Sequence, residues 1–275
     1  MIRTDMTHTG YLQVEVGKRL NKSVITNSYF DGVLKITRPA YLSEDLPLLT
    51  LIHVGGGYVD GDSYLTEVTV SESATLALTT QASTKVYKSP RFGACQTADY
   101  FLKEDSSLYV KQDPLILYKD ASFTQSTHVY MTSSSTFYYT DIVTPGWSKD
   151  GQLFQYKKVT SKMKIFVDGR LAVFDHLHLN PDDRLEPFMY LEGFTHVGTM
   201  YFIHQKVDAH LVEDLSIKLS NLSEQARVGV SLLGVKGLSI RILAVSTTVI
   251  ESIFTEVESY ISDLYVHQEK IAWRK

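Results

Sequence analysis

The stretch HVGGGYVDGDSYLTEVTVSESATLALTTQASTKVYKSP, residues 53–90, is the most informative part of the chain. It opens on three glycines, Gly55, Gly56 and Gly57, which supply backbone conformations that other residues resist. An acidic turn at 60–62 precedes two runs of strand-forming residues, 64–70 and 74–80. The sequence therefore predicts a shaped loop that leads into a polar hairpin.

The glycine run does not match a nucleotide-binding loop. Such a loop requires Lys and then Ser or Thr at the start of a helix, whereas Asp60 and Asp62 stand here and the next run alternates like a strand. Two carboxylates would repel a phosphate, and the further ligands of an EF-hand do not follow at the required spacing. These observations favour a turn that is closed by aspartate side chains.

Units of similar composition recur from this stretch outward. Residues 43–49, 71–78, 103–110 and 132–139 each place small polar or acidic residues before an apolar run. The spacings between units are 28, 32 and 29 residues when they are measured at Leu48, Leu76, Leu108 and Phe137. This recurrence predicts a layered β fold, a solenoid-like or sandwich-like stack of β-hairpins. Ordinary consecutive hairpins would also produce it.

Helical periodicity is confined to the last quarter of the chain. The first apolar stripe comprises Leu211, Val212, Leu215, Leu219 and Leu222, and the second comprises Ile250, Ile253, Phe254, Val257, Ile261 and Leu264. Ser246 or Thr247 is the predicted N-cap of the second helix. No linker or low-complexity segment interrupts the chain. We therefore predict a single domain, 1–275, that is mainly β with two helices in its C-terminal quarter.

Composition limits the class of protein. The net charge is −4, which argues against general nucleic-acid binding. The single cysteine, Cys95, excludes an internal disulfide and is compatible with a reducing compartment. The sequence shows no secretory signal and no apolar run long enough to span a membrane. We expect a cytoplasmic protein with no nucleic-acid or membrane partner.

Two histidines are the most compact pair of candidate metal ligands. His176 and His178 share one face of a predicted strand, about 6.5–7 Å apart, although a polar strand face is the favoured explanation. Cys95 could ligate a borderline-soft metal, but lone cysteines are more often small buried hydrophobes. No Gly-x-Ser-x-Gly elbow occurs. The residues alone leave open a mainly-β hydrolase with a metal site built from the glycine–aspartate loop and these histidines.

The pairing of GGGYVDGD (55–62) with TTQASTKVYKS (79–89) resembles the UreD (UreH) family of urease accessory proteins. The shared motif positions are Gly55, Gly56, Gly57, Gly61, Thr80, Gln81, Thr84, Lys85 and Tyr87. Segments 112–116, 141–146 and 167–179 also agree with the family pattern. Trp147 stands where many members carry Arg, which puts any role of that segment in doubt.

The resemblance implies a maturation chaperone and not an enzyme. Members bind apo-urease and act with UreF-type and UreG-type proteins to load nickel through an internal polar tunnel. Transfer favours weak oxygen ligands, so the implied nickel contacts are Asp62, Ser89 and Asp175, with His176 and His178 as weaker candidates. Each of the three oxygen ligands also has an ordinary structural reading, as a turn acceptor, a cap or a strand-end residue. No tightly bound cofactor is expected.

A bridging protein of this kind should also expose apolar patches to its partners. We expect such patches at residues 137–139 and in the C-terminal segment 260–273. Lys85 and Tyr87 either fix the packing of the motif or meet a partner.

Overall fold

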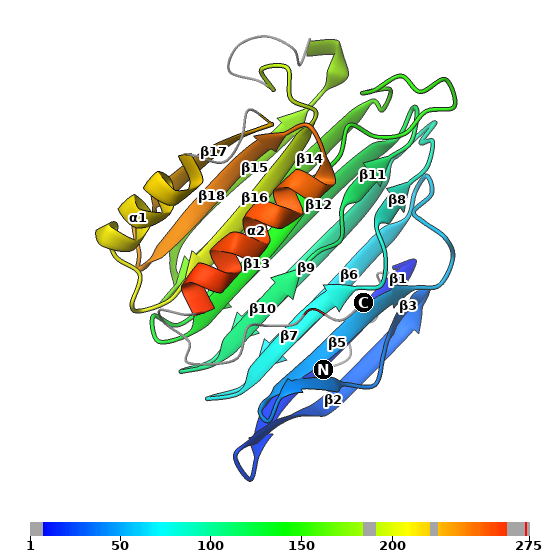
Figure 1. The fold of residues 1–275 in the computed structure, drawn as a ribbon. Coiled ribbons are helices and arrows are strands. Elements are labelled where there is room, and N and C mark those ends of the chain that lie inside the picture. Colours follow the sequence, from blue (N-terminus) through cyan, green and yellow to red (C-terminus); the bar gives the residue numbers. More distant parts are fainter. Residues whose placement is uncertain (1–7, 184–190, 221–224, 263–272, 274–275) are drawn as a thin grey trace.

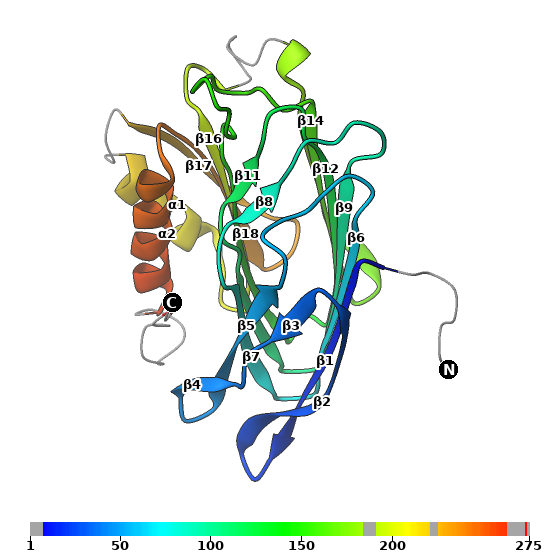
Figure 2. The same ribbon diagram turned by 90° about the vertical axis from the view of Figure 1, so that its right-hand side faces the viewer.

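A computed structural model describes residues 8–183, 191–220, 225–262 and 273. Within these residues two sheets face each other, and both helices lie on the outer side of one of them (Figures 1 and 2). No helix in this described part is both long enough and apolar enough to cross a membrane. The prediction of a layered, mainly-β fold with two late helices is confirmed.

Sheet A has seven strands in the described part of the chain. Their order is β15 (Arg170–Leu179), β14 (Lys158–Val167), β12 (Ser122–Met131), β9 (Ala94–Leu102), β6 (Ser63–Val70), β1 (Gly10–Arg19) and β2 (Lys22–Gly32).

Sheet B contains eleven described strands. Its main path is β17 (Ala226–Leu232), β18 (Gly237–Ala244), β16 (His196–Ile203), β13 (Thr136–Val143), β10 (Ser107–Lys111), β7 (Thr75–Thr80), β5 (Leu46–His53) and β3 (Leu34–Ile36). The strand β4 (Ala40–Ser43) pairs with β5, while β8 (Thr84–Val86) and β11 (Leu115–Leu117) form a short ladder beside the path. Figure 2 shows this ladder on the narrow side of the molecule, between the two sheets.

Between β5 and β14 the chain passes back and forth between the sheets and winds like a solenoid. Parallel pairing joins β6, β9, β12 and β14 in sheet A, and β5, β7, β10 and β13 in sheet B. The hairpin predicted for 64–80 is therefore wrong, because β6 and β7 lie in opposite sheets. Alternating apolar residues cannot distinguish a hairpin from an arch that crosses the core, since both bury one face of each strand.

The sequence repeat coincides with the strand register, with one exception. Leu76 pairs with Leu108, and Leu108 pairs with Phe137, all three between the sheets. Leu48 instead pairs with Ala77 and faces the helices. The alignment of Leu48 with Leu76 was wrong by one residue, and a slip of one residue moves a side chain to the other face of a strand.

One apolar core fills the space between the sheets, and a second lies between sheet B and the helices α1 (Ala209–Ser220) and α2 (Thr247–Ile261). Ser246 is the N-cap of α2, as predicted, and accepts a hydrogen bond from the Val249 N–H. Gly198 on β16 lets α2 approach closely, because a Cβ there would stand 2.6 Å from Ile250 Cγ2. The predicted stripe residues Leu222 and Leu264 lie outside the described residues.

The expected aromatic patch at 137–139 is wrong, because all three side chains are buried. Phe137 and Tyr139 point between the sheets, while Tyr138 lies under α2 and donates a 2.6 Å hydrogen bond to Glu258. Most of the other expected patch, 260–273, falls outside the described residues.

Turns follow the predicted chemistry. Asp168 and Gly169 have φ of 48° and 76° and join β14 to β15 as an antiparallel hairpin. A short 3-10 helix, η1 (Pro181–Asp183), forms the turn that Pro181 indicated.

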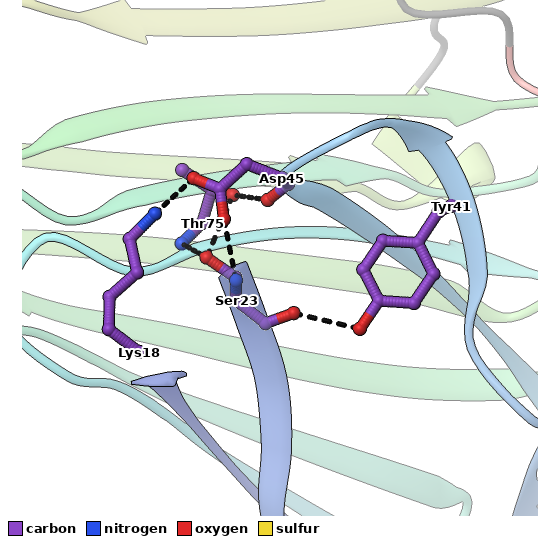
Figure 3. A network of polar contacts seen from close by, with 5 residues as sticks. All are labelled: Lys18, Ser23, Tyr41, Asp45 and Thr75. Carbon is purple, nitrogen blue, oxygen red and sulfur yellow. Dashed lines mark hydrogen bonds and ion pairs between the residues drawn. The ribbon is translucent and has the colours of Figure 1, made fainter. Parts of the chain in front are cut away.

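A polar network ties the β1–β2 turn to the start of β5 (Figure 3). Lys18 forms an ion pair with Asp45, and the Ser23 N–H donates to the same carboxylate at 2.5 Å. The Thr75 N–H and the Tyr41 hydroxyl donate to Ser23, each at 2.9 Å. Burial alone would raise the pKa of Asp45, but the hydrogen bonds from Lys18 and Ser23 outweigh it and lower that pKa. The network therefore fixes this end of the stack through one ionised carboxylate.

Candidate functional site

A line of polar side chains crosses the otherwise apolar layer between the sheets. Gln125 on β12 donates through Nε2 to Asp141 Oδ2 at 2.6 Å and to Ser161 Oγ at 2.8 Å. Asp141 lies on β13 of the opposite sheet, so this contact bridges the two layers. Gln125 and Asp141 are both only 9% exposed.

The line continues along sheet B to an open edge. Asp141 is the register partner of Thr199 on β16, which is in turn the register partner of Arg241 on β18. Arg241 donates to Thr199 Oγ1 at 2.6 Å and to Asp175 Oδ2 at 2.7 Å. The last contact again bridges the sheets, because Asp175 lies on β15 of sheet A.

A cavity of about 200 Å³ opens where the line reaches the edge of the sandwich. Asp175, Arg241, Thr199, Tyr201 and Ser239 supply its polar lining. The side chains of Asp175 and Arg241 are 28% and 37% exposed, so the line passes from a buried carboxylate to a solvated ion pair.

The carboxylate of Asp141, at the buried end of this line, has a shifted pKa. Burial raises the pKa of Asp141, and the opposing hydrogen bond from Gln125 and the charge of Arg241 do not cancel the effect. A buried carboxylate that is only partly compensated attracts a cation more strongly than one in water does. The line therefore offers carboxylate and hydroxyl oxygens, ligands that suit a weakly held divalent ion.

Asp62, predicted from the motif, lies in a different part of the structure. Its carboxylate accepts hydrogen bonds from the Val59 N–H at 2.7 Å, from the Tyr64 hydroxyl at 2.6 Å and from Thr9 Oγ1 at 3.1 Å. His53 Nε2 stands 3.1 Å from the same Tyr64 hydroxyl. In this conformation Asp62 serves as an acceptor that shapes its own loop.

Ser89 is 2% exposed, and its hydroxyl donates to the backbone carbonyl of Tyr87 at 3.1 Å. Lys157 Nζ donates to the Ser89 carbonyl at 2.8 Å. These contacts anchor the segment that leaves β8.

The two histidines lie on the opposite side of β15 from Asp175. His176 and His178 are exposed, with ring centroids 6.2 Å apart, and His178 contacts Thr160 at 3.0 Å. Strand alternation separates them from Asp175, whose side chain points between the sheets. Asp62, Ser89 and Asp175 are likewise not brought together, since three strands of sheet A separate β6 from β15.

The motif around β7 and β8 holds the glycine loop in place. Thr80 Oγ1 donates to Asp113 Oδ2 at 2.8 Å and accepts from the Asp113 N–H at 2.9 Å. The Tyr87 hydroxyl donates to the Gly56 carbonyl at 3.0 Å. Gly57 has φ +145°, and a Cβ there would stand 2.7 Å from the Lys85 carbonyl oxygen.

Among the described residues, no three His, Cys, Asp or Glu side chains gather closely enough to hold a metal ion. Cys95, expected to be buried, is exposed on β9. Sequence reasoning missed Gln125, Asp141 and Arg241. Only Asp141 had a local signal, as a lone acidic residue among the apolar inward positions of β13, whereas Gln125 and Arg241 share their inward faces with Thr127 and Ser239.

Comparison with known proteins identifies the family of this chain. The family model described as "UreD urease accessory protein" matches residues 8–274. The chain belongs to the UreD family. A "Urease accessory protein UreD" of Bacillus sp. (strain TB-90) is 43% identical over 270 residues, which cover 98% of this chain and all of the relative.

Staphylococcal members of the UreD family are also similar. The "Urease accessory protein UreD" of Staphylococcus epidermidis (strain ATCC 12228 / FDA PCI 1200) is 37% identical over 265 residues, 95% of each chain. That of Staphylococcus aureus (strain Newman) is 36% identical over 259 residues, 93% of each chain. Membership of the UreD family gives the chain an accessory role in urease maturation.

Proposed function

We propose that this chain is a non-catalytic scaffold that binds apo-urease and, with UreF-type and UreG-type proteins, supports nickel delivery to the urease active site. The ion would pass along the polar line between the sheets. The observation that supports this route is the series of oxygen donors from buried Asp141 to the edge cavity beside Asp175. UreD family membership supports the partner assignment.

The ligand set on the line suits transit better than storage. Its possible ligands are carboxylate and hydroxyl oxygens, whereas imidazole and thiolate would hold nickel more tightly. Arg241 neutralises Asp175 at the outer end. A cation that reaches Asp175 would have to displace this guanidinium, so the ion pair would act as a gate at the mouth of the line.

The proposal places the chain in the cytoplasm and assigns it no resident cofactor. Its single cysteine is exposed, which suits a reducing compartment. A hydrolase that combines the glycine loop with His176 and His178 receives no support from the geometry. The loop precedes β6, whereas the histidines project from the outer face of β15.

The decisive experiment is co-expression of urease and its other accessory proteins with the wild-type chain, with Asp175→Asn, with Asp141→Asn or with no chain. We expect the urease nickel content to fall in both variants while the accessory complex still co-purifies. Asp31→Asn, which changes an exposed carboxylate on β2, is the matched control. Active urease in the absence of the chain would refute the function, whereas normal nickel content in both variants would refute the route alone.

A further inference from the structure

The narrow side of the stack carries a row of aromatic side chains away from the polar line. Tyr87 follows β8, Tyr118 follows β11, and Trp147 forms an isolated parallel bridge with Tyr118. The ring centroids are 4.8 Å apart between Tyr87 and Tyr118, and 4.9 Å apart between Tyr118 and Trp147. Trp147 is 53% exposed, so the row ends in a solvated indole.

A fourth aromatic side chain projects from the loop that enters β9. Phe92 is 82% exposed. Its loop is nevertheless fixed, because the Asp60 carboxylate accepts the N–H groups of Arg91, Phe92 and Gly93 at 3.1, 2.8 and 2.8 Å. The Gly61 N–H also donates to the Gly93 carbonyl at 2.8 Å. A rigid loop that presents an exposed ring loses little conformational freedom on binding, which is the property of an interface anchor.

The charges around these rings are mainly basic, although the whole chain carries a net charge of −4. Lys85, Arg91 and Lys119 are exposed and lie within two residues of Tyr87, Phe92 and Tyr118 in the sequence. Three nearby carboxylates are already engaged: Asp60 accepts the backbone amides, Asp120 pairs with Lys88 at 3.2 Å, and Asp150 accepts the Gln152 N–H at 3.3 Å. The surface is therefore an aromatic centre with a positive rim.

A protein partner fits this surface better than a nucleic acid does. Single-stranded nucleic acids stack their bases on flat aromatic platforms. Here the rings are tilted against one another, by 53° between Tyr87 and Tyr118 and by 43° between Tyr118 and Trp147. Aromatic side chains and arginine inside a polar rim are typical of protein interfaces.

We infer that this docking face binds a protein of the maturation complex that offers an apolar socket bordered by carboxylates. The docking face is defined as Lys85, Tyr87, Arg91, Phe92, Lys119 and Trp147. The inference rests on the proposed function, and it adds the surface and the chemistry of the partner.

The test is affinity purification of the tagged chain after co-expression with apo-urease and the UreF-type and UreG-type proteins. Phe92→Ala should reduce the retention of one of these proteins at least about ten-fold, as expected for an anchor residue. A Lys85→Glu/Lys119→Glu variant should lose the same protein at about 50 mM salt. At about 500 mM salt, the difference in retention between this variant and wild type should become smaller, because salt screens the charges. The matched control is Leu20→Ala, since Leu20 is fully exposed at the β1–β2 turn, the opposite end of sheet A.

The possible results are distinguishable. Selective loss of one partner in Phe92→Ala, with a thermal melt like that of wild type, supports the docking face. If Phe92→Ala retains all three proteins within two-fold of wild type, the docking face is refuted. It is also refuted if Phe92→Ala loses bound nucleic acid and keeps every protein. If the wild-type chain itself retains none of the three proteins, the proposed function fails before the variants are compared.

Discussion

Thr80→Val tests whether the Thr-Thr-Gln motif is architectural. The Thr80 hydroxyl makes two hydrogen bonds to Asp113, one to its carboxylate at 2.8 Å and one from its N–H at 2.9 Å. Asp113 is 6% exposed, so water cannot readily replace both contacts. Valine keeps the shape of threonine and removes the hydroxyl.

The expected cost follows from these two contacts. A hydrogen bond to a charged group contributes about 1.5–3 kcal/mol and a neutral one about 0.5–1.5 kcal/mol. Because Thr80 is only half-buried, we take the lower part of the combined range, about 2–3 kcal/mol. For a chain of this size that loss lowers Tm by roughly 4–8 °C.

Thermal and urea unfolding, followed by circular dichroism, measure the effect, and Thr80→Ser is the matched control because it retains the hydroxyl. We expect the serine variant to lose less than about half of what valine loses. A valine variant within about 0.5 kcal/mol of wild type would refute the reasoning. If that variant also lowered urease nickel content, the motif would have a direct role in delivery.

Three further variants test other parts of the structure. Because the folded pKa of Asp45 is lowered, its stabilisation is complete above the ordinary value near 3.8 and is lost as pH falls through the folded pKa. In urea titrations, the free energy of unfolding of Asp45→Asn should therefore be lower than that of wild type at about pH 6, and the two values should converge towards about pH 2. A difference in free energy that does not change with pH would contradict this. Gly146→Ala should lower the free energy of unfolding clearly more than Gly151→Ala does in the same titrations. Both glycines have positive φ, but only at Gly146 would a Cβ collide, 2.4 Å from the Leu117 carbonyl oxygen; equal costs would disprove the collision. Phe254→Ala removes a fully buried ring on the inner face of α2 and should cost about 3–5 kcal/mol of unfolding free energy, and a loss below about 1 kcal/mol would show that α2 packs differently.

The parts of the fold that depend on short-range patterns were predictable. The Asp168–Gly169 turn, the Ser246 cap and the two helical stripes are each determined by residues within a few positions of one another. The pairing of Leu76 with Leu108 was also visible, because a solenoid repeats its composition with its structure.

Long-range arrangement was not predictable from the pattern. Leu48 was aligned with the wrong residue because both faces of β5 are apolar where it pairs with β7. The polar line was missed for a related reason. Gln125 meets Asp141 across the core and Asp175 meets Arg241 across the edge, and no local pattern links residues on different sheets.

The parallel stacking of the strands has a consequence for how the molecule ends. A solenoid whose last rung matched its first would accept a second molecule edge to edge, and the two would begin a filament. Both edges of each sheet instead consist of antiparallel strands: β2 and β15 in sheet A, β3 and β17 in sheet B. The β1–β2 and β14–β15 pairs each contain an irregularity in register, which interrupts the regular edge. Irregular edges of this kind are one way in which β-proteins oppose pairing with another chain, whereas a partner that binds the narrow side would not prolong either sheet.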